Sequence, residues 1–180
     1  MLKGKKINLR TVRRKDLEAY LELASGVQSR GPHFPLNLPT ETSLQTRFEK
    51  DGFWSDESGS LLIVDPETDA ILGLVVHFKP VHYYDAVEIG YIVFDPGRRG
   101  KGVMTEALAQ FTRYLFDLKP IHRIQAQIEP SNVASRRVAE KCGFRYEGTM
   151  RQAIISRGEP CDLDVFSILR SELGAEGSEG

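Results

Sequence analysis

The chain has 180 residues, of which 41% are hydrophobic and 27% are charged, and its formal net charge is −1 with a sequence pI near 6.4. This length and composition fit one globular domain, and the balanced charge argues against nucleic acid or an anionic membrane as a partner. Two cysteines, Cys142 and Cys161, no secretory leader and no apolar run of membrane-spanning length favour a reducing cytoplasm.

The first half of the chain alternates between strand and helix patterns. Apolar residues at every second position predict strands, and apolar residues three and four apart predict helices. A Pro- and Gly-rich stretch predicts a packed loop that could shape a substrate pocket. In chain order we expect a strand at 6–13, a helix at 17–24, this loop at 26–39, a helix at 40–50 capped by Thr40, and a hairpin of strands 61–64 and 71–78.

The most informative stretch is Val87–Leu118, which reads as an apolar strand at 87–94, a Pro/Gly corner and a long amphipathic helix. Glycines in the corner allow a tight turn beside a ligand, and the helix start points unpaired N–H groups and a positive dipole end at the same place. The corner holds Gly97, Arg98, Arg99, Gly100, Lys101 and Gly102, followed by Thr105. This pattern is typical of a pyrophosphate-binding turn, and also of an ordinary tight turn.

The second half predicts the rest of a mixed sheet. Because a helix separates the strands at 87–94 and 121–128, these two should be parallel and joined by a right-handed crossover. The helix face carries Met104, Ala107, Leu108, Phe111 and Leu115. We further expect a helix at 131–142 that ends at Gly143 in a Schellman cap, strands at 145–155 and 162–169, and a disordered tail at 174–180.

Three motifs give the chain its resemblance to a known family. They are EIGYIVFDPGRRGKGVMTEAL at 88–108, EPSNVASRRVAEKCGFRYEGTMRQA at 129–153, and D-x-x-x-F-S-I-L-R-S-E at 162–172. At these separations they resemble the GNAT N-acetyltransferase superfamily, and most closely its RimJ/RimL-type (ribosomal-protein N-terminal acetyltransferase-like) branch. That branch acetylates protein N-terminal amines and includes many relatives that act on small amines. The resemblance implies a single α+β domain over 1–173. Its fold would be the three-layer GNAT fold, with flanking helices and a mostly antiparallel sheet containing one splayed parallel strand pair.

The resemblance also implies acetyl-CoA as cosubstrate. Its diphosphate would lie on the turn and the helix start, at Arg98, Arg99, Gly100, Lys101, Gly102, Val103, Met104 and Thr105. Its pantetheine arm would run beside Ile92, Val93 and Phe94, flanked by Asn132 and Ser135. Asn132 also suits a helix cap, and both roles can hold at once. The one departure from the family motif is Gly97, where Gln or Arg is usual.

The acceptor implied by the resemblance is a primary amine. The branch that the chain resembles favours the N-terminal α-amine of a protein such as a ribosomal protein. With a pKa of roughly 7.7–8.0, such an amine needs less help than lysine in losing its proton. A small-molecule amine is the alternative, and a non-catalytic acyl-CoA-binding module is a further one. The resemblance to the family also allows a homodimer.

Two residues are candidates for proton transfer. Glu88 shares a strand face with Gly90 and resembles the base glutamate of the histone-acetylating branch, although a structural salt bridge would also explain it. Ser135 is the candidate that assists the departing thiol, with Ser131 and Tyr91 as rivals.

The four histidines do not suggest a metal site. His33, His77, His82 and His122 are scattered, without the close spacing of metal ligands. We therefore expect no metal, and we expect each histidine to lie on the surface or in a loop.

Overall fold

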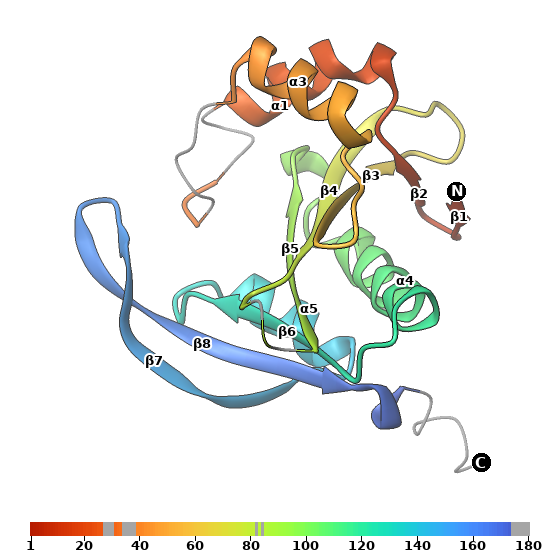
Figure 1. The fold of residues 1–180 in the computed structure, drawn as a ribbon. Helices are drawn as coiled ribbons and strands as arrows, with labels where there is room; N and C mark the ends of the chain where they lie inside the picture. Colours follow the sequence, from red (N-terminus) through yellow and green to blue (C-terminus); the bar gives the residue numbers. More distant parts are fainter. Residues whose placement is uncertain (27–30, 34–38, 82, 84, 174–180) are drawn as a thin grey trace.

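The structure is a computed structural model that describes residues 1–26, 31–33, 39–81, 83 and 85–173. One eight-stranded sheet runs through it in the order β1-β2-β3-β4-β5-β6-β8-β7 (Figure 1). The strands are β1 (Leu2–Lys3), β2 (Asn8–Thr11), β3 (Ser58–Val64), β4 (Ile71–Phe78), β5 (Ala86–Val93), β6 (Arg123–Ile128), β7 (Arg145–Ser156) and β8 (Glu159–Leu169). The α-helices are α1 (Leu17–Ser25), α3 (Glu41–Asp51), α4 (Val103–Leu118) and α5 (Val133–Lys141).

The pairing of β5 with β6 is the irregular part of the sheet. It is parallel, as predicted, and every other described pair is antiparallel. The parallel ladder covers only Ala86–Glu88 against Arg123–Gln125. Beyond it, β5 stays paired with β4 as far as Val93, and β6 stays paired with β8 as far as Ile128. The two strands therefore separate after Glu88.

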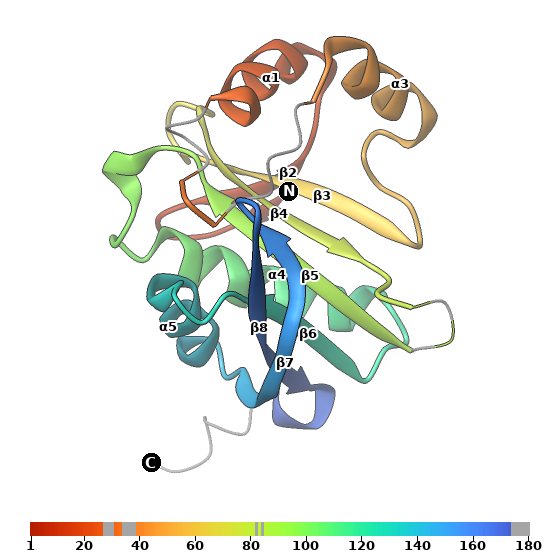
Figure 2. The ribbon, with the colours of Figure 1, turned by 90° about the vertical axis from the view of Figure 1, so that its left-hand side faces the viewer.

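Different helices cover the two faces of the sheet. On one face, which we call the α4 face, α4 and α5 pack on side chains such as Val87, Ile89 and Ile124. On the other, the α1 face, α1 and α3 cover side chains such as Leu74, Ile92 and Phe94 (Figures 1 and 2). Because side chains alternate along a strand, Glu88 belongs to the α1 face with Ile92 and Phe94.

Local sequence signals place the helices α3, α4 and α5. The predicted apolar face of α4 is buried throughout, so the helical pattern is confirmed. α5 ends in a Schellman motif at Gly143, whose φ is +82°. The Phe144 N–H bonds the Ala139 carbonyl and the Gly143 N–H bonds the Glu140 carbonyl, both at 3.0 Å. Thr40 caps α3 by accepting from the Ser43 N–H at 3.1 Å.

Several predicted boundaries differ from the structure. The first strand is shorter than 6–13, and the unpredicted β1 pairs beside it. β8 begins at Glu159 rather than 162, because a tight turn closes the hairpin with Ser156 opposite Glu159. Most of the 26–39 loop and the 174–180 tail lie outside the described residues. None of the described helices is long and apolar enough to cross a membrane.

His77 corrects the expectation that every histidine lies on the surface or in a loop. It belongs to β4, is 1% exposed, and lies 4.9 Å from Trp54 between ring centroids. Neither ring nitrogen has a hydrogen-bond partner among the residues described. Burial, with the charge of Lys119 as a second cause, lowers its pKa to about 4. His77 is therefore a neutral core side chain at neutral pH.

This burial predicts a pH-dependent loss of stability. Between pH 6.5 and about 4 the unfolded chain protonates His77 while the folded chain does not, so acidification favours unfolding by roughly 3 kcal/mol at most. In urea unfolding across this range, His77→Leu should lose less stability on acidification than the parent. His122→Leu, at an exposed histidine, is the control and should keep the parental slope. A parental slope in His77→Leu would contradict the assignment.

Candidate active site

The separation of β5 and β6 leaves two strand edges facing a gap. Residues 89–93 of β5 and 126–128 of β6 form no ladder with each other. Buried backbone N–H and C=O groups need partners, so a ligand that carries amides is suited to such a gap. The pantetheine arm of acetyl-CoA has this chemistry.

A cavity of about 670 Å³ lies beside the gap, on the side of α5 and the start of α4. Three segments supply its walls: β5, the glycine turn and α5, with the described piece Gly31–His33 at its edge. The residues that line it are Gly31, Pro32, His33, Tyr91, Ile92, Val93, Arg98, Arg99, Gly100, Gly102, Val103, Met104, Thr105, Ser131, Asn132, Val133, Ala134, Ser135, Arg137, Val138 and Lys141. Its size is in the range of small-molecule and cofactor sites.

The start of α4 is suited to an anion. Gly102 is the N-cap residue, with φ +81°, and no side chain caps the helix there. The first N–H groups of the helix therefore lack an internal partner, and Val103, Met104 and Thr105 line the cavity. Because the helix dipole adds positive potential at the same place, a diphosphate would be stabilised here.

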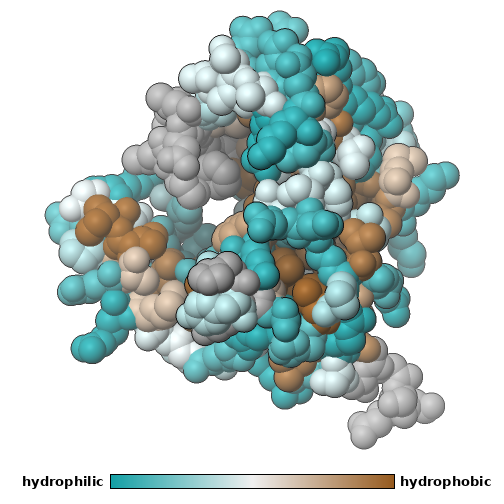
Figure 3. Space-filling model, viewed as in Figure 1, coloured by the Kyte–Doolittle hydropathy of each residue, from teal (hydrophilic) through white to brown (hydrophobic). Residues whose placement is uncertain are grey.

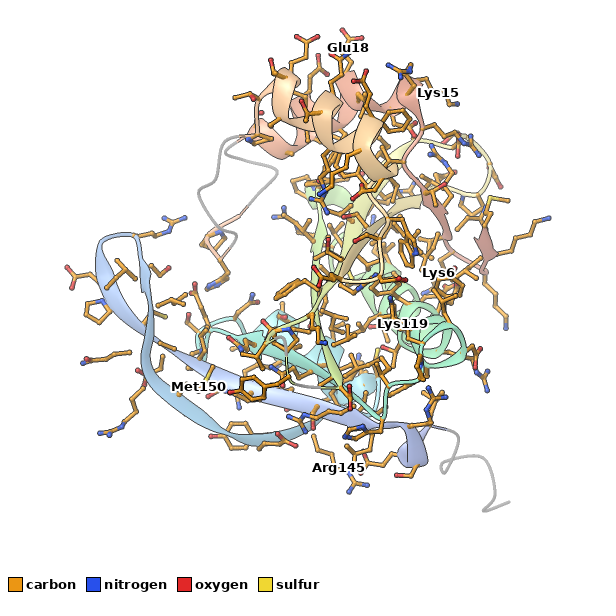
Figure 4. All side chains as sticks on the ribbon, in the orientation of Figure 1. Lys6, Lys15, Glu18, Lys119, Arg145 and Met150 are labelled. Atoms are coloured by element: carbon orange, nitrogen blue, oxygen red, sulfur yellow. The ribbon has the colours of Figure 1, made fainter. Side chains whose placement is uncertain are left out.

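The two arginines of the turn are held by contacts with neighbouring segments. Arg98 forms an ion pair with Asp65 at 3.0 Å, and the Arg99 Nε donates to the Val93 carbonyl at 3.1 Å. Lys101 does not line the cavity; its carbonyl accepts from the Lys6 Nζ at 2.9 Å, and Lys6 lies beside α4 (Figure 4).

Two hydroxyl groups meet where the gap and the cavity join. The Ser135 Oγ donates to the Tyr91 hydroxyl at 2.9 Å, and the Tyr91 hydroxyl donates to the Ser135 carbonyl at 3.2 Å. Burial raises the pKa of Tyr91 to about 12, so the phenol stays protonated at neutral pH. Asn132 accepts from the Ser135 N–H at 3.1 Å, so its side chain caps α5 while lining the cavity.

The cavity brings together eleven of the thirteen predicted cofactor residues. Phe94 and Lys101 are the two that do not line it. Phe94 is 1% exposed and contacts Tyr20 on the α1 face, because alternation along the strand turns it away from Val93. On α5 the prediction missed Val133, Ala134, Val138 and Lys141. Ala134, Val138 and Lys141 follow the i, i+4, i+7 spacing of one helix face, so helical periodicity could have found them.

Glu88 lies where the strands begin to separate, on the α1 face. It is 8% exposed, and its Oε2 accepts from the side-chain amides of Gln125 and Gln127, both at 2.8 Å. Burial raises the pKa of Glu88, and the two amide donors act in the opposite direction. Among the ion pairs of the described residues none involves Glu88, so the salt-bridge alternative finds no partner there.

The β7–β8 hairpin borders an open space on the α1 face of the sheet. The space-filling view is open between this hairpin and the body of the sheet (Figure 3). The Arg157 Nε donates to the Pro32 carbonyl at 3.2 Å near the hairpin tip. Glu129 contacts His33 at 2.7 Å and accepts from the Ser156 hydroxyl at 3.1 Å. These contacts join the hairpin to the described piece of the α1–α3 connection.

A sheet that opens between its two parallel strands, with an uncapped helix start beside the opening, is the arrangement that the resemblance to GNAT acetyltransferases implied. The sequence matches the family described as "Acetyltransferase (GNAT) domain" over residues 6–145. The chain belongs to this GNAT acetyltransferase family. It is an acetyl-CoA-dependent N-acetyltransferase, and the recognition from sequence is confirmed.

Three known proteins illustrate the similarity. The probable N-acetyltransferase YjcK of Bacillus subtilis is 32% identical over 184 residues, covering 96% of this chain and 98% of that protein. The [ribosomal protein uS5]-alanine N-acetyltransferase of Escherichia coli is 32% identical over 99 residues, covering 54% of this chain and 50% of that protein. Spermidine N-acetyltransferase from Vibrio cholerae, solved with CoA and spermine, shares the fold with a TM-score of 0.81 at 20% identity, over 94% of this chain and 99% of that one.

The part of the chain that the structure describes contains no group of three His, Cys, Asp or Glu side chains placed to hold a metal ion. Acetyl-CoA is the cosubstrate, and the expectation of no metal stays a prediction.

The cavity predicts which cations of α5 contribute to CoA binding. Arg137 and Lys141 line it, whereas the neighbouring Arg136 lies 3.6 Å from Asp164 and over the Phe166 ring. In titration calorimetry with CoA, Arg137→Ala and Lys141→Ala should each weaken binding about tenfold, because each removes a cation near the phosphates. Arg136→Ala is the control and should bind CoA like the parent. The reverse ranking would contradict this arrangement.

Proposed function

We propose that the chain acetylates the N-terminal α-amine of a protein, using Glu88 as the base. The observation that carries this proposal is the position of Glu88 where the strands separate, on the face opposite the Ser135–Tyr91 hydroxyl pair. An amine beside Glu88 and a thioester in the gap would place the incoming nitrogen and the departing sulfur on opposite sides of the sheet. Attack and departure from opposite sides avoid a steric conflict between the two substrates.

Each side chain would then have one task. Bound acetyl-CoA supplies the acetyl thioester as the electrophile. Glu88 accepts a proton from the acceptor nitrogen, directly or through water, as its N–C bond forms. Ser135 can turn its hydroxyl from Tyr91 and donate to the sulfur as the C–S bond breaks. Tyr91 keeps the serine hydroxyl at the join between gap and cavity.

The raised pKa of Glu88 suits this role. A general base works best when its pKa is close to the operating pH, and burial raises the pKa of the Glu88 carboxyl above its ordinary value. An α-amine, with a pKa of roughly 7.7–8.0, needs only modest help to lose its proton. Lysine, at about 10.4, would need far more.

The similarity to the E. coli ribosomal-protein enzyme supports a protein acceptor. That match covers about half of each chain, so it supports the acceptor class without identifying the acceptor. We propose that residues 1–173 act as one catalytic domain in the cytoplasm, where the free thiols of Cys142 and Cys161 stay reduced. A homodimer, as family habit allows, stays a prediction.

The acceptor prediction is tested by competition between two amine classes. The protein is incubated with labelled acetyl-CoA, peptides with free N-termini and a panel of polyamines, and the products are identified by mass spectrometry. We expect label on peptide α-amines, and none on matched peptides whose N-termini are blocked and whose lysines are free. Label confined to polyamines would favour the small-molecule alternative. Tight acetyl-CoA binding without any transfer would favour the non-catalytic module.

The base assignment makes a second prediction. Glu88→Gln should lower kcat by roughly a hundredfold, because the amide cannot accept the proton. The protonation of Glu88 should also disappear from the pH dependence of kcat, while that of the acceptor amine remains. Glu67→Gln, at an exposed glutamate in the β3–β4 turn, is the control and should change neither. An unchanged rate and pH profile in Glu88→Gln would exclude Glu88 as the base.

A further inference from the structure

A chain of polar side chains crosses β6, β7 and β8 on the α1 face and ends at Glu88. The Ser167 hydroxyl donates to Glu147 at 2.6 Å, and Glu147 accepts two bonds of 2.6 Å from the Arg123 guanidinium. Arg123 reaches the Gln125 Oε1 at 3.5 Å, and the Gln125 amide nitrogen donates to Glu88. These side chains therefore form a continuous path to the candidate base.

The path fixes which way the Gln125 amide faces. Its oxygen lies toward the Arg123 cation and its NH₂ group lies toward the Glu88 carboxylate. The opposite orientation would place an amide oxygen against the carboxylate and the NH₂ group against the guanidinium, and both contacts are repulsive. The pairing of Arg123 with Glu147 holds the cation in place, and it keeps the pKa of Glu147 at about 2. Gln125 is thus set as a donor to Glu88.

Both amide donors reach the same oxygen of Glu88. Gln125 and Gln127 each donate to Oε2 at 2.8 Å. None of the hydrogen bonds found among the described residues reaches Oε1. The carboxylate is thereby held by one oxygen while the other remains available to a ligand.

We propose that Gln125 and Gln127 are positioning residues for the base: they hold Oε2 of Glu88, present Oε1 to the acceptor amine and stabilise the ionised carboxylate. This inference rests on the proposed role of Glu88. The two glutamines do not touch the reacting atoms, and they act only through Glu88.

The two amides are the groups that favour the ionised form of Glu88, against the larger effect of burial. Across the sheet, Phe78 on β4 and Gln125 on β6 are its register partners, and neither carries a charge. The charged groups nearest along the polar path are Arg123 and Glu147, which are paired with each other. Burial raises the pKa of Glu88 and the two amides lower it. Removing an amide should therefore raise this pKa further, so that protonation stops the reaction at a higher pH.

The test compares variants that keep side-chain shape but remove the donor. Gln125→Met and Gln127→Met are assayed for kcat against pH, at saturating acetyl-CoA, with the acceptor that the parent enzyme acetylates. In the plot of kcat against pH, we expect the rising limb, which reports the ionisation of Glu88, to move to higher pH in both variants. At pH 7, kcat should fall about tenfold. The matched control is Gln45→Met, since the exposed Gln45 amide also donates to a glutamate, Glu49, at 3.2 Å. The control should keep the parental profile.

Parallel measurements separate this inference from the proposed function. Thermal melting and CoA affinity close to parental values in both methionine variants exclude misfolding as the cause of a shift. If Glu88→Gln loses the limb while both methionine variants keep the parental profile, the positioning role is wrong and the base assignment stands. If Glu88→Gln keeps the parental rate and profile, the base assignment fails, and the inference fails with it. A limb that moves to lower pH in the methionine variants would also overturn the inference.

Discussion

The structure depends on one interruption of backbone pairing. β5 and β6 form a parallel ladder over three residues each, and the hydrogen bonding then stops at Glu88 and Gln125. Elsewhere each strand keeps its outer partner, so the sheet is opened without being divided. An open edge inside a sheet leaves backbone groups without partners, which costs free energy unless a ligand or water satisfies them. The gap thus presents backbone N–H and C=O groups that can bind a ligand.

The side chains around the gap differ between the two faces of the sheet. On the α4 face, the uncapped start of α4 and the cations of α5 form a cavity suited to phosphates. On the α1 face, a buried glutamate is held by two amides and bordered by the β7–β8 hairpin. The hydroxyls of Tyr91 and Ser135 also lie on the α4 face, beside the gap. Each face therefore has the chemistry for one substrate of an acetyl transfer.

Local signals in the sequence predicted most of the fold. The apolar face of α4, the Schellman motif at Gly143 and the Thr40 cap depend on residues close together in the chain, and all three are confirmed. The parallel crossover also followed from local order, because a helix separates the two strands. Motif resemblance then supplied the family, which a glycine turn alone could not.

What the sequence left open depends on contacts between distant segments. Gln125 and Gln127 alternate with apolar residues in β6, but their bonds to Glu88 depend on the register between two strands that are far apart in the chain. His77 was expected on the surface or in a loop, and its burial in β4 follows from packing against Trp54, which is distant in the chain. Phe94 is a different case, since strand alternation alone could have separated it from Val93. The acceptor remains open because no motif in the chain encodes it.

We propose that the two substrates reach the gap from opposite faces of the sheet. A crystal structure with a bisubstrate analogue, in which CoA is joined through an acetyl linker to a peptide α-amine, tests it most directly. We expect the CoA portion in the cavity beside α4 and α5, the linker between β5 and β6, and the peptide nitrogen next to Oε1 of Glu88. A peptide portion that leaves the gap on the α4 face, away from Glu88, would contradict it.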